Sequence, residues 1–304
     1  MYKAYGMVER TILRLVKKDI VKEGIEKIEA GRGTLLDEGT FSIKSYELRV
    51  EYLLLQEMGY SEVYEYSGEV TFSYRPWNKY CKWHNGPIEE ADDPRKRLYC
   101  PVAADGFCRK HKSSERALYD FCLSYRGEKA LEACREVDKR VKGEYIVYLL
   151  DHGEKKPKVG TTRKFRLVER IAEQPHIVAA GVYVTDSIYR ARLMEINIAK
   201  TGLASELWRH KWISADLYAS IIRFRRSLEA IKKELGLSND IQMFRVKKPI
   251  STTPLKEERV EGEEFSIMNS WGGYVMLKKD GRIIIYPEKQ ILNTDALLVK
   301  KLKL

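Results

Sequence analysis

The fold of this chain is decided by residues 144–202, which begin EYIVYLLDHGEKKPKVGTTR. The apolar run Tyr145–Leu150 predicts a strand, and the polar turn after it returns the chain through Lys158–Gly160, which predicts a hairpin. Helical and strand-like patterns then alternate over residues 162–173, 177–184 and 187–201. The predicted order is therefore strand, strand, helix, strand, helix.

The second of these helices carries an acidic residue on its apolar side. Apolar residues recur three or four positions apart along it, at Ile188, Ala191 and Ile198, and Glu195 falls within the same stripe. A buried carboxylate needs a partner, because an unpaired buried charge is very costly. Two partners are open from the sequence: an arginine on a facing helix, or a metal ion.

These elements resemble those of the GIY-YIG nucleases. In that family two antiparallel strands carry the two motifs, a following helix carries an essential arginine, and a later helix carries a metal-binding glutamate. Here Tyr148 ends the counterpart of the first motif and Lys158–Gly160 is the counterpart of the second, while Arg170 and Glu195 match the arginine and the glutamate. The resemblance implies a catalytic site of Tyr148, Lys158, Arg170 and Glu195, with Mg²⁺ or Mn²⁺ held by Glu195.

Two positions depart from the family pattern. Ile146 replaces the first-motif glycine, and Lys158 replaces the second-motif tyrosine, which is a candidate general base in the family. A lysine can take that role only if burial or nearby cations lower its pKa. Two functions therefore stay open: a divalent-metal-dependent endonuclease, or a non-catalytic RNA- or ribosome-associated binding protein that retains the fold.

Residues 76–113 contain two Cys-x-x-His pairs, Cys81 with His84 and Cys108 with His111. This spacing lets one tight turn present two ligands to the same small cation, so the two pairs predict a tetrahedral zinc site, with Cys100 as an alternative ligand. Four protein ligands leave no open position for chemistry, so the zinc would be structural. The alternative is a set of buried thiols and surface imidazoles.

The Cys/His pairs together with the central domain resemble a second family. Over roughly residues 76–202, the pairs, Lys158–Arg163, Arg170 and Glu173-Gln174 are similar to an uncharacterised prokaryotic family known as domain of unknown function 2797. Its members often have Cys-x-x-Cys where this chain has Cys-x-x-His. This resemblance implies a fold and no established activity.

Charge points to an anionic partner. The chain has 55 Lys and Arg against 44 Asp and Glu, a net charge of +11, which favours nucleic acid, either DNA or RNA. The alternative is a basic surface that only aids solubility. Protein partners are unknown from the sequence, and an interaction protein whose basic faces meet acidic proteins stays open as a third function. The candidate nucleic-acid contacts are Arg109, Lys110, Arg163, Lys164, Arg166, Arg223 and Arg226.

The sequence lacks an apolar run near the roughly 20 residues that span a bilayer, and its first residues lack the apolar core of a secretion signal. We therefore expect a cytoplasmic protein with no membrane partner.

In the N-terminal part, Val8–Ile28 is spaced like a helix. In the C-terminal part, Asp280-Gly281 predicts a hairpin turn. Residues 114–142 are expected to form two short helices divided at Gly127, between which Cys122 and Cys134 could meet as thiols or as a disulfide.

The predicted class is α+β with several domains. These are an N-terminal α+β domain (1–75), zinc-binding knuckles (76–113), a helical linker (114–142), a GIY-YIG-like α/β domain with the order β-β-α-β-α (143–204), an amphipathic basic helix (205–240) and a small β-rich C-terminal domain (241–304).

Overall fold

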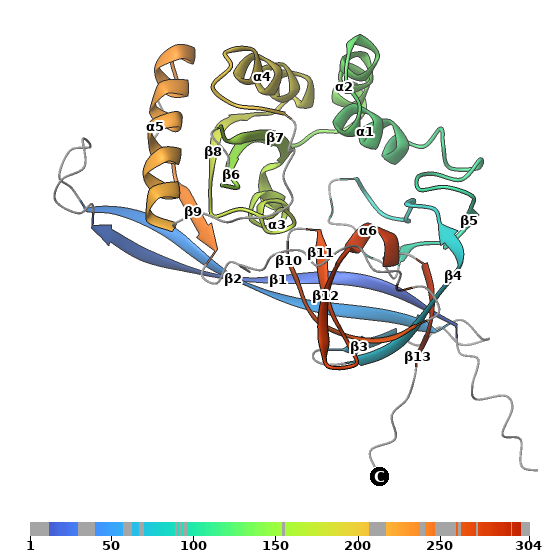
Figure 1. Ribbon diagram of the computed structural model, residues 1–304. Helices are drawn as coiled ribbons and strands as arrows, with labels where there is room; N and C mark the ends of the chain where they lie inside the picture. Colours follow the sequence, from blue (N-terminus) through green and yellow to red (C-terminus); the bar gives the residue numbers. More distant parts are fainter. Residues whose placement is uncertain are drawn as a thin grey trace, which may run out of the picture. The chain divides into compact units, whose positions relative to one another are not determined.

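The computed structural model (Figure 1) confirms the mixed α+β class. It describes residues 12–29, 40–56, 63–66, 70–88, 90, 93, 96–153, 156–206, 217–237, 241–246, 260, 263–271, 273–292 and 294–298. The chain divides into two compact units. The first unit comprises Met1–Ile20, Val50–Ala117 and Pro254–Leu304, and the second comprises Val21–Arg49 and Leu118–Thr253. Within the described residues, no helix combines the length and apolar character that crossing a bilayer requires.

The second unit is built around β6 (Tyr145–Asp151), all of whose residues are buried. This strand pairs antiparallel with β7 (Lys158–Arg163) and with β8 (Val178–Thr185), and β9 (Met243–Val246) pairs with β8. The sequence predicted the hairpin and the third strand. A strand buried on both faces reads as a continuous apolar run, which is what Tyr145–Leu150 shows.

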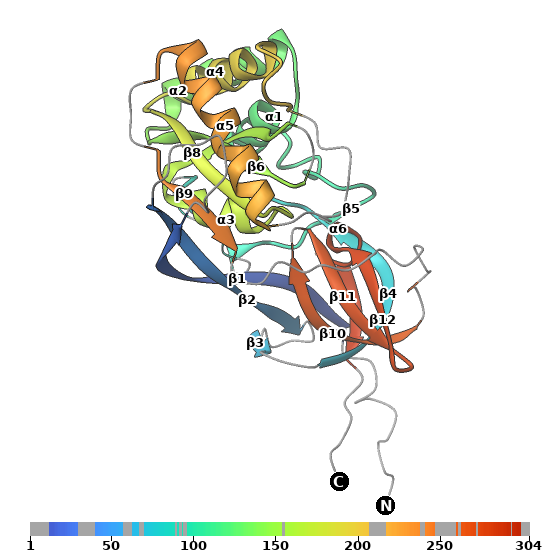
Figure 2. The ribbon, with the colours of Figure 1, turned by 60° about the vertical axis from the view of Figure 1, so that its left-hand side comes forward.

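Helices cover these strands. They are α3 (Leu167–Ala172), α4 (Ile188–Lys200) and α5 (Leu217–Leu235), and all three contact β6. Figure 2 shows α5 lying across β6 and β8. The predicted order strand, strand, helix, strand, helix is therefore present. The basic helix predicted over 205–240 is α5 in its described part, and residues 207–216 and 238–240 of that prediction lie outside the described residues.

Two further helices, α1 (Glu115–Ser124) and α2 (Glu128–Arg140), meet at Gly127, where the sequence predicted the break. Gly127 has φ +86°, a conformation that strains other residues. A disulfide between Cys122 and Cys134 joins the two helices, so the open question of their pairing is answered by the structure. α2 packs against α4.

Two long strands, β1 (Ile12–Glu29) and β2 (Thr40–Gln56), contribute residues to both units. In the second unit, β2 pairs parallel with β9 through Lys44–Tyr46. The helix predicted for Val8–Ile28 is wrong wherever the chain is described, because Ile12–Glu29 is a strand; residues 8–11 lie outside the described residues. The segment is rich in Ile and Val and contains Gly24, which favour a strand once a pairing partner is present.

The first unit contains an antiparallel sheet. Its strand order is β12, β11, β10, β4, β13, β1, formed by β4 (Val70–Tyr80), β10 (Glu264–Trp271), β11 (Tyr274–Lys279), β12 (Arg282–Pro287), β13 (Thr294–Leu298) and the start of β1. Asp280 and Gly281 both have positive φ and join β11 to β12, which confirms the predicted two-residue turn.

Smaller elements complete the first unit. β3 (Val63–Tyr66) pairs with the end of β2, and β5 (Pro101–Val102) pairs with the end of β4. A short helix, α6 (Glu288–Ile291), follows β12. The β4–β5 pairing matters for the site, because it brings the residues after Tyr80 next to those before Pro101.

Candidate functional site

Three of the predicted zinc ligands gather in the first unit. Cys81 Sγ, Cys108 Sγ and His111 Nδ1 all lie within 4.8 Å of one another. Nδ1 is 3.2 Å from Cys108 Sγ and 3.7 Å from Cys81 Sγ. A tetrahedral ion with bonds of about 2.3 Å to sulfur and about 2.0 Å to nitrogen separates such atoms by roughly 3.5 Å. The group can therefore hold a metal ion of the size of zinc.

The backbone positions these ligands. Cys81 follows β4, and its N–H donates to the Cys100 carbonyl (2.9 Å). Cys108 and His111 occupy one tight turn, in which the His111 N–H donates to the Cys108 carbonyl (2.9 Å). The Cys81 sulfur accepts the N–H of Cys108 at 3.2 Å and that of Trp83 at 3.5 Å. Backbone N–H groups directed at a sulfur stabilise a thiolate, which is the metal-binding form.

Trp83 and the neighbouring backbone complete the surroundings of the group. The Trp83 ring stacks on His111 with centroids 4.3 Å apart, which fixes the plane of the imidazole. Burial raises the pKa of the Cys108 thiol, but the N–H groups of His111 and Lys110, together with hydrogen bonds to Cys81 and Cys100, outweigh it and lower that pKa. Both effects prepare the group for a cation.

His84 does not join the group. It is buried, with 3% of its surface exposed, and forms an antiparallel bridge with Arg97. Cys100, the alternative ligand, lies next to His111, with its sulfur 3.7 Å from Nδ1, but it is not one of the residues whose ligand atoms all lie within 4.8 Å of one another. The pairing of β5 with β4 carries Cys100 to Cys81, a contact that the x-x spacing could not reveal. The structure therefore shows a group of two cysteines and one histidine, with Cys100 next to His111 as the candidate for a fourth ligand.

A second cluster, in the second unit, joins three of the predicted catalytic residues through Gln174. The Gln174 amide nitrogen donates to the Tyr148 hydroxyl (2.8 Å) and to the Arg170 carbonyl (3.1 Å), and its oxygen accepts from the Lys158 ammonium. Tyr148 and Gly160 are opposite each other on β6 and β7. A Cβ at Gly160 would lie 2.6 Å from the Tyr148 oxygen, so only glycine leaves room for this tyrosine.

Burial perturbs the two titratable side chains that bond the Gln174 side chain, Lys158 and Tyr148. It lowers the pKa of Lys158 to about 8, with Arg170 adding to the shift and Glu195 opposing it. It raises the pKa of Tyr148, whose hydroxyl therefore stays protonated at neutral pH. The Lys158 ammonium bonds a neutral amide rather than a carboxylate. We call Tyr148, Lys158, Arg170 and Gln174 the Gln174 cluster.

Glu195 is buried, as its place in the apolar stripe predicted, with 5% of its surface exposed. Its Oε2 is 2.5 Å from Arg192 Nη1 and accepts a hydrogen bond from the Thr161 hydroxyl (2.5 Å). Arg192 lies one turn earlier on the same helix, not on a facing helix, and also donates to the Tyr125 carbonyl (3.2 Å). Of the two partners left open by the sequence, the structure contains the arginine.

Two residues that the sequence reasoning did not single out support Gln174. His176 Nδ1 is 2.6 Å from the Gln174 carbonyl, and its Nε2 contacts the Tyr46 hydroxyl. Burial lowers the pKa of His176 to about 4, so the ring is neutral at pH 7. The neutral ring can donate from Nδ1 to Gln174 and accept from Tyr46 at Nε2. The only sequence signal for this role is the position of His176, two residues after Gln174.

The predicted nucleic-acid contact Arg163 is a core residue. It is 3% exposed, and its guanidinium lies over the rings of Tyr145 (4.9 Å) and Tyr119 (5.4 Å). The alternation of side chains along β7 turns it inward, so it stabilises the hairpin by cation–π contacts and is withdrawn from a phosphate backbone.

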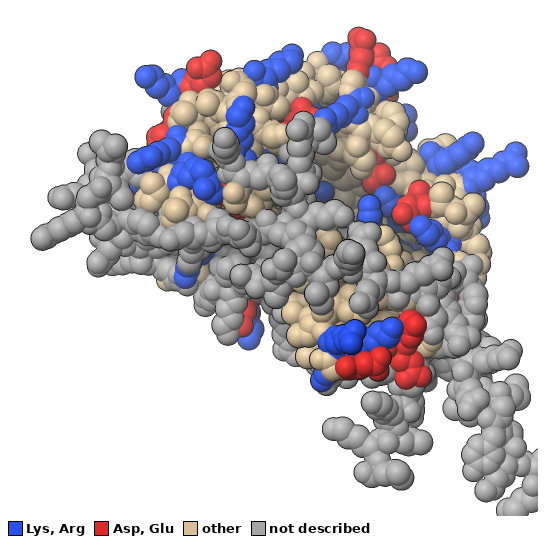
Figure 3. All heavy atoms as spheres, in the orientation of Figure 1, with Lys and Arg blue, Asp and Glu red and all other residues tan. Residues whose placement is uncertain are grey.

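The other predicted contacts are at the surface or near it. Arg109, Lys110 and Arg226 have exposed side chains. Lys164 pairs with Glu144, and Arg166 pairs with Glu169 and Glu173. Partly exposed pairs contribute only about 0–1 kcal/mol, so a phosphate can compete for these two cations. Arg223 differs, because its partner Asp151 is 2% exposed and would be left buried without a cation. Figure 3 shows Lys and Arg spread over the face in view rather than gathered in one stripe.

No family model matches the chain, and no curated protein or solved structure is significantly similar to it.

Proposed function

We propose that the chain is a zinc-containing nucleic-acid-binding protein in which a GIY-YIG-like domain (143–204) holds a phosphodiester at the Gln174 cluster. The observation that carries the proposal is the lysine of this cluster. Lys158 is partly buried and bonds a neutral amide, with Arg170 near enough to lower its pKa further. Lys158 has no anionic partner within the cluster, and Arg170 pairs with the partly exposed Glu173 at 2.6 Å, a pair with which a phosphate can compete.

The orientation of Gln174 suits this ligand. Its amide nitrogen donates to the Tyr148 oxygen, which leaves the Tyr148 O–H to donate elsewhere. A phosphate oxygen at the cluster would accept from Tyr148, Lys158 and Arg170. The net charge of +11 raises the local concentration of any polyanion and favours its encounter with the site.

The zinc would be held by Cys81, Cys100, Cys108 and His111. Three thiolates and an imidazole are soft ligands that suit Zn²⁺ better than Mg²⁺ or Ca²⁺. With four protein ligands its role is to stabilise the fold of residues 80–112, a segment with few apolar residues to form a core of its own.

Binding can be measured by fluorescence anisotropy with labelled single-stranded, duplex and hairpin DNA and RNA. We expect Lys158→Gln and Arg170→Gln to raise the Kd about tenfold or more, since each loses a phosphate contact. Lys139→Gln, which removes an exposed cation from α2, is the matched control and should leave the Kd within about twofold. Equal Kd values for all four proteins, or no binding by any, would reject the proposal.

A second function, metal-dependent phosphodiester cleavage, is favoured by two observations. A pKa of about 8 suits Lys158 to accept the proton of an attacking water. Arg192 and Thr161 both contact Glu195 through Oε2, so the other oxygen, Oε1, is the one that a metal ion would bind. The Arg192 ion pair already neutralises Glu195, however, and a Mg²⁺ or Mn²⁺ ion would have to compete with it. We therefore rank binding above cleavage.

Cleavage is tested with the same substrates and Mg²⁺ or Mn²⁺. Products that appear with the natural chain and are lost in Glu195→Gln would establish the enzyme. Intact substrates, in protein that binds them, would leave the non-catalytic binding protein as the function.

A further inference from the structure

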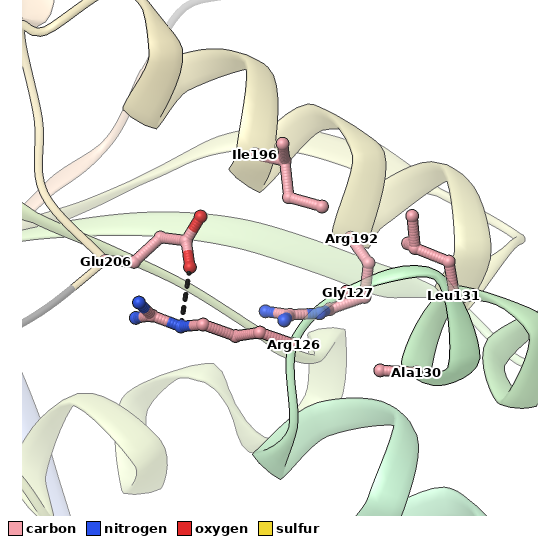
Figure 4. Close-up of a pocket in the computed structure, with 7 residues that line it drawn as sticks. All are labelled: Arg126, Gly127, Ala130, Leu131, Arg192, Ile196 and Glu206. Atoms are coloured by element: carbon pink, nitrogen blue, oxygen red, sulfur yellow. Dashed lines mark ion pairs between the residues drawn. The ribbon is translucent and has the colours of Figure 1, made fainter.

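The second unit contains a cavity of about 280 Å³ between α2, α4 and the turn before α2 (Figure 4). Its apolar walls are Ala130 and Leu131 of α2 and Ile196 of α4. Small-molecule sites commonly start at roughly 300 Å³, so the cavity is suited to a compact ligand. It is separate from the Gln174 cluster, none of whose members lines it.

The polar part of the lining is two arginines and one glutamate. Arg126 Nε is 3.0 Å from Glu206 Oε2, and the Arg126 side chain is half exposed. Arg192 is 6% exposed, and its Nε is a buried donor for which the described residues provide no acceptor. Figure 4 shows both arginine side chains extending in the same direction, toward Glu206. Arg126 is paired with Glu206 and Arg192 with Glu195, so what the lining offers a ligand is the half-exposed guanidinium of Arg126 and the buried Nε donor of Arg192.

The walls are held in place without a ligand. Arg126, Ala130 and Leu131 all lie between Cys122 and Cys134, which the disulfide joins. Arg192 is held from two sides, by Glu195 and by the Tyr125 carbonyl. A cavity whose walls are fixed in advance binds a ligand with little loss of conformational entropy.

We propose that this cavity binds a small organic monocarboxylate with a compact apolar body. The apolar body packs against Leu131 and Ile196, and burying it supplies much of the affinity. The carboxylate bonds Arg126, which contacts Glu206 through Nε, and approaches the Arg192 donor. The proposal stands independently of nucleic-acid binding, because it rests on different residues.

Isothermal titration of the full chain with three probes tests the ligand class. Benzoate has both the charge and the apolar body, benzamide keeps the shape without the charge, and inorganic phosphate has charge without the body. We expect saturable binding of benzoate, with benzamide and phosphate at least about tenfold weaker. Equal affinity for all three, or no saturable binding of benzoate, would overturn the proposal.

Variants locate the binding. Arg126→Gln removes an exposed cation, and Ile196→Phe fills the cavity; each should weaken benzoate about tenfold. Lys200→Gln, exposed on the same helix as Ile196, should leave the affinity unchanged. If Ile196→Phe does not fold, Arg126→Gln decides the question by itself. Benzoate binding by Arg126→Gln equal to that of the natural chain would place the ligand elsewhere and contradict the assignment.

Discussion

The contact between Glu195 and Arg192 dominates the chemistry of α4 at the scale of single residues. Both side chains are almost entirely buried, 6% and 7% exposed, and their charged atoms are 2.5 Å apart. Removing two charges from water costs several kcal/mol, which their attraction and the bond from Thr161 offset. Removing either charge by itself should therefore destabilise the helix, because the other charge would stay buried without its partner.

Replacing Arg192 by Leu should lower the free energy of unfolding by about 3–5 kcal/mol, because Glu195 is then left buried without a cation. Urea denaturation measures the change. Arg190→Leu on the same helix is the matched control, since Arg190 is exposed and pairs loosely with Asp186 at 3.9 Å; it should change stability by less than about 0.5 kcal/mol. A small effect of Arg192→Leu would show that Glu195 has another partner.

His176 should make stability depend on pH. Its pKa is about 4 in the folded chain and about 6.5 when unfolded. The unfolded state therefore binds the extra proton as the pH falls from about 6.5 towards 4, and stability is lost in that window. Between pH 7 and pH 5 the natural chain should lose about 2 kcal/mol more than His176→Gln, which does not titrate. If urea denaturation shows the same loss of stability between pH 7 and pH 5 for the two proteins, the buried neutral ring is contradicted.

For single residues, the sequence predicted burial correctly where the spacing of residues along one helix determines which side is buried. The apolar stripe placed Glu195 inside, because helical periodicity fixes which face a residue occupies. The stripe could not name Arg192 as its partner, since a long side chain three positions away can point in several directions. Gln174 was quoted only as part of a family pattern, and its bonds to Tyr148 and Lys158 depend on a strand register that local sequence does not specify.

The Cys/His segment is the element with the clearest test. Cys100→Ser should reduce bound zinc well below one equivalent per chain, because it removes the proposed fourth ligand, whose sulfur lies 3.7 Å from His111 Nδ1. His84→Asn should keep about one equivalent, because His84 lies outside the group. Metal analysis of protein purified without chelator measures both. Zinc lost from His84→Asn and kept in Cys100→Ser would restore the paired Cys-x-x-His arrangement.

The α1–α2 corner depends on its disulfide. Cys122 and Cys134 are 12 residues apart, and closing a loop of this length stabilises a fold by about 2–3 kcal/mol. We expect dithiothreitol to lower the stability of the natural chain by that amount and to have no effect on the double variant Cys122→Ser/Cys134→Ser. Equal stability of the natural chain with and without reductant would mean that the thiols are free in solution.

Elements with local signals were predicted correctly, and the one with an ambiguous signal was not. The Asp280-Gly281 turn and the break at Gly127 are specified by residues that adopt positive φ readily. Ile12–Glu29 carries apolar residues at a spacing that a helix also tolerates. Its strand state depends on pairing with β13, nearly 300 residues away in the chain, which no local pattern encodes.

At the scale of the whole molecule, strands distant in sequence share one sheet. β4 pairs with β10 and β13, so residues 70–80 and 264–298 belong to the same unit, although the sequence analysis assigned them to separate domains. Binary patterns reveal that a strand exists and which face is apolar, but not its partner. Similarly, the charge count indicated an anionic partner, whereas only coordinates separate buried Arg163 from exposed Arg109.

The account rests on Lys158 meeting a phosphate, and the pKa of this lysine tests it most directly. NMR of protein labelled at lysine Cε, with the Lys158 signal assigned by its loss in Lys158→Gln, should show titration near pH 8 in the free chain. Saturating oligonucleotide should raise this pKa by a unit or more, because a phosphate stabilises the ammonium form. A Lys158 pKa that stays unchanged when the oligonucleotide is bound would contradict the account.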